Sequence, residues 1–155
     1  MFFSLADSTI SRTFNPLAGD DAEEVVERVF SAMEFDNGYY KNVQRTNLAQ
    51  ILRMFSDAGE MPTFARLLEF ITNPDKLIEM ADKATDDSLK DWADAFKANS
   101  KRTEENSGLT SQLATFAHGG SSRLFNVVDP EIDLEEVLAN NKIVYFQLPA
   151  MKHPF

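Results

Sequence analysis

The fold of this chain is decided by one stretch near its C-terminal end, DLEEVLANNKIVYFQLP (Asp133–Pro149). Its first half, Asp133–Ala139, predicts a short helix, and Asn140-Asn141 predicts a tight turn. The run Ile143–Leu148 is β-branched, aromatic and almost unbroken in its apolarity, which is typical of a strand buried on both faces. Because a single buried strand cannot satisfy its own backbone hydrogen bonds, this strand needs a sheet.

Nearly all of the chain before this stretch has the pattern of helices. Apolar residues recur at helical spacing and are separated by capping and breaking residues. The first helix is expected to start at Asp20 or Asp21 and to stop at Asp36-Asn37-Gly38. Further helices are expected over 39–58, 63–72, 74–84 with Asn73 as its cap, 86–102, 109–118 and 133–139. The segment 124–128 is expected to be irregular or extended.

The only plausible partner region for the C-terminal strand is the apolar run Phe2–Ala6 at the other end of the chain. We therefore expect Ile143–Leu148 to lie beside Phe2–Leu5. The resulting fold class is all-α, a bundle of six or seven helices with short strands at both termini.

Composition places the chain among folded proteins of ordinary domain size. It has 155 residues, of which 43% are hydrophobic and 13 are Phe, so a sizeable core is expected. The absence of cysteine excludes disulfides and thiolate metal sites. No apolar run reaches membrane-spanning length, and the N-terminal residues lack the basic region of a signal peptide.

The formal net charge of −10 bears on which partners the chain can bind. Non-specific DNA binding needs clustered Lys and Arg that neutralise phosphates, so a free-standing domain this acidic is a poor candidate for it. A basic partner protein would suit it better, through complementary potentials. The alternative is that the acidity only keeps a helical domain soluble.

The motifs of common enzyme chemistries are missing. No Gly-x-x-x-x-Gly-Lys-Ser/Thr loop is present, and the glycine-rich Gly119–Arg123 lacks both the lysine and a preceding strand. His118 and His153 are far apart and have no flanking metal-ligand spacing. Adjacent acidic residues fall in first helical turns or on outer faces, where they compensate the helix dipole or are solvated. We expect neither catalysis nor a cofactor or metal site in this chain.

Two groups of residues are candidates for binding a partner. The first is the aromatic and basic run at the start of the 39–58 helix, where Tyr39, Tyr40, Lys41 and Arg45 could form a binding face. Partial burial of the tyrosine rings with wet hydroxyls explains this run equally well. The second group is the most basic stretch of the chain, with Lys97, Lys101 and Arg102. Cations at a helix C-terminus also have a purely structural explanation, because they suit the helix dipole.

Both ends of the helical region resemble a known family. The start is carried by Phe14–Leu17 and Gly19–Val25, and the end by Ser107–Leu113, Ile132–Leu138 and Lys142–Pro149. These segments resemble the start and the end of the all-α domain of type IV secretion coupling proteins, the TraD/TraG-like ATPases. The resemblance is strongest at the two ends and weak in the middle helices.

The resemblance implies an all-α domain inserted into a RecA-like nucleotide-binding domain. Residues 1–13 and 141–155 would then belong to the nucleotide-binding domain, and residues 14–140 would be the all-α domain. The Walker A and Walker B motifs would lie outside this chain, so ATP and Mg would be cofactors of the parent protein alone. No catalytic residue of the family can be carried onto any position here.

The family also implies a place and a set of partners. Its members are hexameric, membrane-anchored ATPases, and the all-α domain lies on the cytoplasmic face of the bacterial inner membrane. There it is thought to contact protein substrates, adaptor proteins or the relaxase–DNA complex on the way to the translocation channel. The domain by itself is expected to be a monomer, because the ATPase domain drives hexamer formation in the family.

We therefore expect a substrate-recognition or gating domain that docks protein substrates or adaptors and has no enzymatic activity of its own. The alternative is contact with single-stranded DNA in a conjugative transfer ATPase, through Lys97, Lys101, Arg102 and the run from Tyr39 to Arg45. A third reading, a stand-alone helical enzyme, needs a convergent polar pocket that the sequence does not show.

Overall fold

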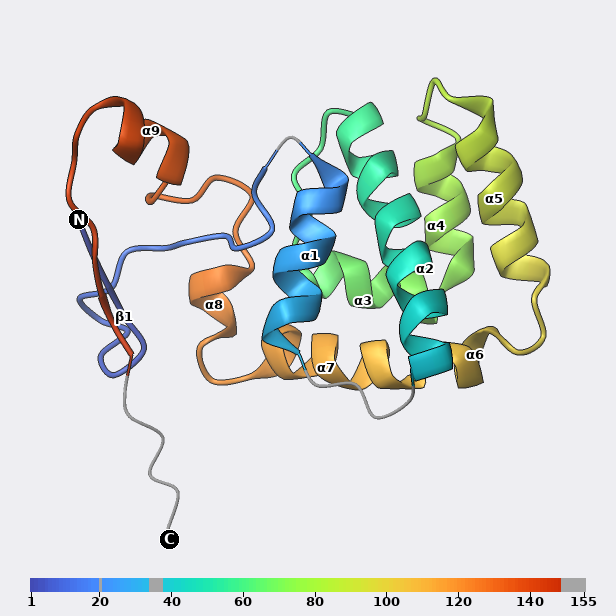
Figure 1. Cartoon of the computed structure of the whole chain (residues 1–155), viewed down its shortest axis with the longest axis horizontal. Helices are drawn as coiled ribbons and strands as arrows, with labels where there is room; N and C mark the ends of the chain where they lie inside the picture. The colour runs from blue at the N-terminus through green and yellow to red at the C-terminus, as the bar shows by residue number, and fades with distance from the viewer. Residues whose placement is uncertain (20, 34–37, 149–155) are drawn as a thin grey trace, which may run out of the picture.

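The computed structural model describes residues 1–19, 21–33 and 38–148, which form nine helices and two short strands (Figure 1). In chain order these are β1 (Phe2–Ser4), α1 (Ala22–Ala32), α2 (Gly38–Asp57), α3 (Phe64–Thr72), α4 (Pro74–Ala81), α5 (Asp87–Ala98), α6 (Arg102–Glu105), α7 (Ser107–His118), α8 (Ser122–Phe125), α9 (Leu134–Ala139) and β2 (Tyr145–Gln147). The predicted helical fold with strands at both ends is thus confirmed for the described residues.

Three details of the helix prediction are wrong. The expected helix over 86–102 ends at Ala98, because the Asn99 side chain accepts a hydrogen bond from the backbone N–H of Lys101 at 2.9 Å and starts a new turn, α6. Leu124 and Phe125 belong to a helical turn, α8, whereas Val127 and Val128 are irregular as expected. These two single turns raise the helix count from six or seven to nine. Asn73 precedes α4 as expected, but its side chain makes no capping bond.

Four helix starts follow ordinary capping chemistry. Asp21, Thr63, Asp86 and Asp133 each accept a hydrogen bond from a backbone N–H of the first turn that follows them. Gly59 adopts φ +65° just after α2, a left-handed conformation that glycine adopts at no steric cost. The sequence signals at these positions therefore act locally, within three residues of each boundary.

The helices α1 to α7 are here called the helical body, and all of them except α6 contribute buried residues to one hydrophobic core. Leu48 and Ile51 of α2, Leu67 of α3 and Leu113 of α7 are completely buried in it. Aromatic rings stack between helices, with Phe55 on Phe70 at 5.3 Å and Phe64 on Phe116 at 4.8 Å between ring centroids. The predicted apolar stripes thus face one another in the structure.

A second, smaller cluster lies at the other end of the molecule, where the N-terminal and C-terminal segments meet. Phe3, Leu124 and Ile132 are buried there, and Phe14 and Phe146 pack on Phe3 with ring centroids 6.1 and 5.6 Å away. The contact of Phe3 with Phe146 brings together residues more than a hundred positions apart in the sequence. The cluster underlies the two strands, here called the terminal sheet.

The strands β1 and β2 pair in parallel, with Phe2 opposite Tyr145 and Ser4 opposite Gln147. The expected neighbourhood of Ile143–Leu148 and Phe2–Leu5 is confirmed, and Figure 1 shows the two strands side by side. Parallel neighbours need a crossover connection, and here the whole helical body lies between them.

The prediction that this strand is buried on both faces is wrong for the chain by itself. Ile143 is 83% exposed, and Tyr145 and Leu148 are each 64% exposed. The reason is that the described sheet has two strands only, so β2 has a partner on one side and no layer over its outer face. The outer side of β1 is occupied, since Arg12 donates its backbone N–H to the Phe2 carbonyl at 3.0 Å.

Candidate functional site

The two predicted binding groups lie at the same end of the helical body. The Tyr40 hydroxyl, in the first turn of α2, donates a hydrogen bond to Glu104 of α6 at 2.8 Å. One turn later the Gln44 amide donates to the Glu105 carbonyl at 2.7 Å, and Asn47 donates to Asn106 at 3.0 Å. Figure 1 shows the start of α2 beside α6. Tertiary packing thus joins segments that are about sixty residues apart.

Most of the predicted cations on this surface have partners within the chain. Arg45 forms an ion pair with Glu27 of α1, and Lys97 forms one with Asp75 of α4 at 2.7 Å. This pair raises the pKa of the Lys97 ammonium and lowers the pKa of the Asp75 carboxyl.

The remaining predicted residues differ in what surrounds them. Arg102 donates to the Lys97 carbonyl at 2.7 Å and lies over the Phe96 ring at 5.9 Å. Lys41 and Lys101 are exposed, and the Tyr39 side chain lies outside what the structure describes. The surface is therefore a mixture of both charges rather than a cluster of cations.

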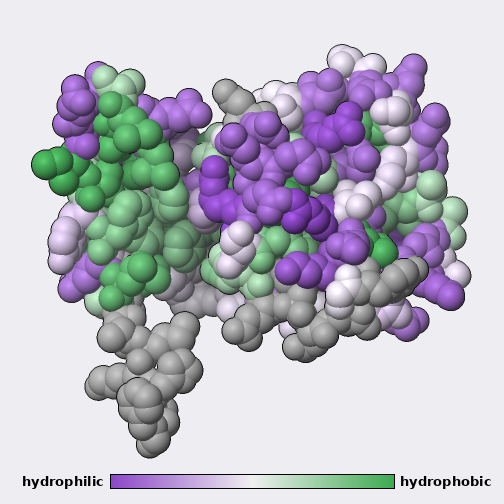
Figure 2. All heavy atoms as spheres, viewed as in Figure 1, coloured by the Kyte–Doolittle hydropathy of each residue, from purple (hydrophilic) through white to green (hydrophobic). Residues whose placement is uncertain are grey.

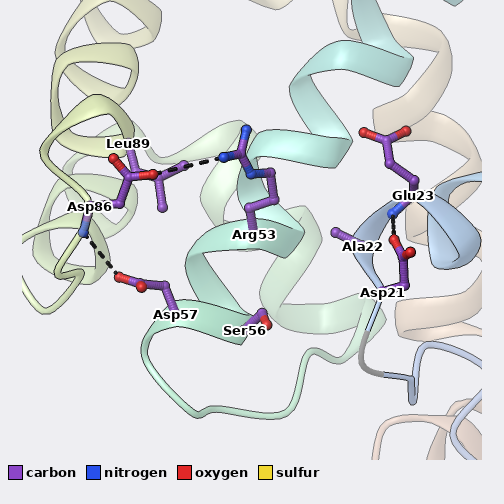
Figure 3. A pocket seen from close by; sticks show the side chains of 8 residues that line it. All are labelled: Asp21, Ala22, Glu23, Arg53, Ser56, Asp57, Asp86 and Leu89. Carbon is purple, nitrogen blue, oxygen red and sulfur yellow. Dashed lines mark hydrogen bonds and ion pairs between the residues drawn. The ribbon is translucent and has the colours of Figure 1, made fainter.

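A hollow of about 630 Å³ lies at the opposite end of α2 (Figure 3). No site is predicted there from the sequence. The start of α1 supplies Asp21 and Glu23, the end of α2 supplies Arg53 and Asp57, and the start of α5 supplies Asp86. Four carboxylates thus line the hollow together with one guanidinium, which forms an ion pair with Asp86 at 3.8 Å.

Three of the four carboxylates of this hollow already accept hydrogen bonds that stabilise the fold. Asp21 and Asp86 cap α1 and α5, and Asp57 accepts hydrogen bonds from the Thr85 backbone N–H at 2.5 Å and hydroxyl at 2.8 Å. The Thr85 bonds lower the pKa of the Asp57 carboxyl. Within the described residues, no group of three or more His, Cys, Asp or Glu has a geometry that could hold a metal ion.

Exposed apolar side chains gather at the end of the molecule that carries α9 and the terminal sheet. Figure 2 shows this surface on the left, over α9 and the terminal sheet. The large hydrophobic residues that are exposed in the described parts of the chain are Ile10, Val128, Leu134, Leu138, Ile143, Tyr145, Phe146 and Leu148. None of them lies in the described residues of the helical body. An apolar surface confined to one end, next to an unpaired strand edge, has the character of an interface.

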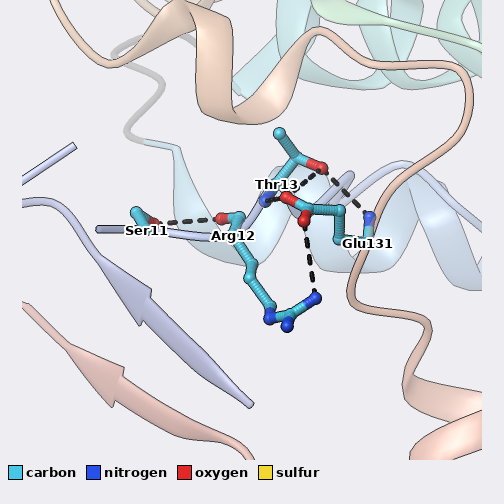
Figure 4. A network of polar contacts seen from close by, with 4 residues as sticks. All are labelled: Ser11, Arg12, Thr13 and Glu131. Atoms are coloured by element: carbon cyan, nitrogen blue, oxygen red, sulfur yellow. Dashed lines mark hydrogen bonds and ion pairs between the residues drawn. The ribbon is translucent and has the colours of Figure 1, made fainter. Parts of the chain in front are cut away.

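A polar network holds the chain segments together where the helical body joins the terminal sheet (Figure 4). Glu131 accepts a hydrogen bond from the Thr13 backbone N–H at 2.9 Å and contacts the Arg12 guanidinium at 3.4 Å. Beside it, Phe14 and Ile132 form an isolated parallel bridge. The two segments that connect to the helical body therefore run side by side in the same direction, as β1 and β2 do.

Asn15 is the buried centre of this junction. Its side chain is 1% exposed and donates to the carbonyls of Pro62 at 2.8 Å and Val127 at 2.9 Å. The side-chain amide oxygen Oδ1 of Asn15 accepts a hydrogen bond from the Leu17 backbone N–H at 2.9 Å. The motif Asn15-Pro16-Leu17, which contributes to the family resemblance, thus ties three separate segments together.

Comparisons with known proteins give no assignment: no family model, no curated protein and no solved structure matches this chain. Within the described residues, no helix is both long enough and apolar enough to cross a membrane. The family resemblance, the absence of enzymatic activity and the inner-membrane location therefore stay predictions.

Proposed function

We propose that this chain is the all-α domain of a type IV secretion coupling ATPase, where it recognises or gates protein substrates and adaptors. One observation carries the proposal. β1 and β2 are parallel neighbours joined through the helical body, and no other described residue pairs with the second edge of β2, which lies beside an exposed apolar surface. A domain inserted between two adjacent strands of a larger parallel sheet would bring its two ends together as parallel neighbours. The apolar surface would be exposed in the isolated chain, because helices cover both faces of such sheets in the complete protein.

In this proposal the terminal sheet is the continuation of a RecA-like sheet, and the parent protein supplies the nucleotide site. ATP and Mg would bind to the parent, and the chain itself would turn over no nucleotide. The parent would hold this domain at the cytoplasmic face of the bacterial inner membrane. The exposed residues Ile143, Tyr145 and Leu148 would be covered by the rest of that sheet and its helices.

The charge distribution favours a protein over DNA as the docked partner. Arg45 and Lys97 are neutralised by Glu27 and Asp75, and the net charge is −10. Phosphate contacts would have to break these ion pairs. We therefore expect weak binding of single-stranded DNA that changes little with salt. Binding that falls steeply as salt is added, and that is lost in a Lys97→Ala variant, would favour the DNA alternative.

The inserted-domain proposal is tested by the reading frame on either side of this chain. We expect a Gly-x-x-x-x-Gly-Lys-Ser/Thr motif before it and an acidic Walker B strand after it. A reading frame confined to residues 1–155 would overturn the proposal. The purified chain provides a second test, since ATP hydrolysis above background would be incompatible with a domain that lacks the nucleotide site.

A further inference from the structure

A groove of about 430 Å³ lies where the helical body meets the segment that leads into α9. In Figure 1 the loop between α8 and α9 passes beside the loop that leads into α1. Apart from Ala18, the apolar side chains of its lining are those of Phe14, Met61, Val128, Pro130, Ile132 and Leu134. Val128 is 62% exposed and Leu134 is 43% exposed, so both present apolar surface to solvent.

The polar part of the lining is strongly acidic. It contains the carboxylates Asp21, Glu24, Asp129, Asp133 and Glu135, against the single guanidinium of Arg28. The Arg28 side chain donates to the backbone carbonyls of Pro16 at 2.8 Å and Ala18 at 2.9 Å, which fixes it against the wall.

The five carboxylates differ in how far they are engaged. Asp21 and Asp133 act as helix caps. Glu24, Asp129 and Glu135 are exposed and form no hydrogen bond or ion pair through their side chains with any described residue. An apolar floor with three unpaired carboxylates around it is chemically complementary to one kind of ligand.

We propose that this junction groove binds an amphipathic, cationic segment of a partner protein. Its apolar side chains would cover Val128 and Leu134, while its Lys or Arg side chains would meet Glu24, Asp129 and Glu135. The acidic rim opposes nucleic acid and anionic membrane surfaces, and the net charge of −10 opposes a second copy of the chain. The proposal rests on the docking function above for the partner's role, whereas the chemistry of the groove is independent of the ATPase assignment.

The groove can be tested with a fluorescein-labelled peptide of Lys, Leu and Ala, with Leu and Lys on opposite faces of a helix, by fluorescence anisotropy. Two control peptides replace every Leu by Ser or every Lys by Glu. We expect the Lys/Leu peptide to bind at least tenfold more tightly than either control. Equal binding of the Ser peptide would overturn the proposal, because charge alone would then explain the attraction.

Two sets of variants locate the binding site. The double variant Glu24→Lys with Glu135→Lys should weaken binding of the Lys/Leu peptide by about tenfold or more. The matched control, Asp91→Lys with Asp94→Lys on the exposed face of α5, changes the net charge equally and should weaken it less than threefold. Equal weakening by both double variants would overturn the proposal.

A variant of the apolar floor gives a further readout that does not depend on charge. Because Val128 is exposed, its replacement by Ser should leave the fold intact, as checked by circular dichroism. We expect Val128→Ser to weaken binding of the Lys/Leu peptide threefold or more without changing its salt dependence. Unchanged affinity would refute docking over this floor. If the peptide binds as expected but the reading frame of the protein lacks nucleotide-binding motifs, the groove proposal holds and the coupling-protein assignment fails.

Discussion

Replacing Asn15 by Ala should destabilise this protein far more than its single small side chain suggests. The substitution removes two donated hydrogen bonds, to Pro62 at 2.8 Å and to Val127 at 2.9 Å, and one accepted from Leu17 at 2.9 Å. The site is 1% exposed, so water cannot replace the lost partners without entering the junction.

The magnitude follows from what is left behind. Each hydrogen bond contributes about 1 kcal/mol net, and a buried polar group without a partner costs about 1–3 kcal/mol. Allowing for partial relaxation, we expect Asn15→Ala to lower the free energy of unfolding by roughly 2–4 kcal/mol. In a chain of this size that corresponds to a fall in Tm of roughly 5–15 °C.

Urea unfolding followed by circular dichroism and by fluorescence of Trp92 would measure this loss. Trp92 is the only tryptophan of the chain and stacks on Phe96 at 5.1 Å, so it reports on the helical body. The matched control is Asn42→Ala on the exposed face of α2, which should not lower stability, because Ala is the better helix former. A loss below about 0.5 kcal/mol for Asn15→Ala, or a loss equal to that of the control, would refute the role assigned to the junction.

Two further predictions concern an ion pair and a turn. Ion pairs with Arg66 at 2.5 Å and Lys83 at 2.9 Å lower the pKa of the Glu60 carboxyl in the folded protein. The stability that these ion pairs confer is therefore complete at a pH above the pKa of Glu60 in the unfolded chain, and it is lost as the pH falls through the lower pKa of the folded protein. Glu60→Gln should therefore be less stable than wild type by up to about 1 kcal/mol at neutral pH. In urea titrations the difference should shrink as the pH falls below the ordinary carboxyl pKa of 4.5, and a constant difference would contradict it. Gly119→Ala should lower the free energy of unfolding by about 1–3 kcal/mol, since the added Cβ would lie 2.5 Å from the Thr115 carbonyl oxygen. The control Gly120→Ala has open space around the added Cβ and should lower it by less than about 1 kcal/mol in the same urea titration.

The helical part of the fold could be predicted because its signals are local. Asp21 and Asp86 cap helices through backbone groups two residues away, and the apolar stripes of α2 and α3 recur within each helix. The single turns α6 and α8 escaped prediction because each is only four residues long and carries no periodic pattern. The pairing of the two strands could be expected from their number, since the C-terminal strand had one plausible partner region.

The candidate binding residues stay predictions, and the sequence predicted only part of their surroundings. The Tyr39–Arg45 run and the Lys97–Arg102 stretch do lie near each other, through the contact of Tyr40 with Glu104. Their partners could not be predicted, because Glu27 and Asp75 come from other helices and nothing in the local sequence marks them. The junction groove was missed for the same reason, as Glu24 and Glu135 are ordinary first-turn acids when each helix is considered by itself.

The helical class, most helix boundaries, the two terminal strands and the acidic charge can all be predicted from the amino-acid sequence. These properties depend on neighbours within a few positions or on composition alone. Three features emerge only once the chain is folded: which cations are neutralised, that β2 pairs on one edge only within the part of the chain that the structure describes, and that Val128 and Leu134 meet an acidic rim. The physical reason is that each of these features joins groups from distant parts of the chain, and their distances are set by packing rather than by sequence spacing.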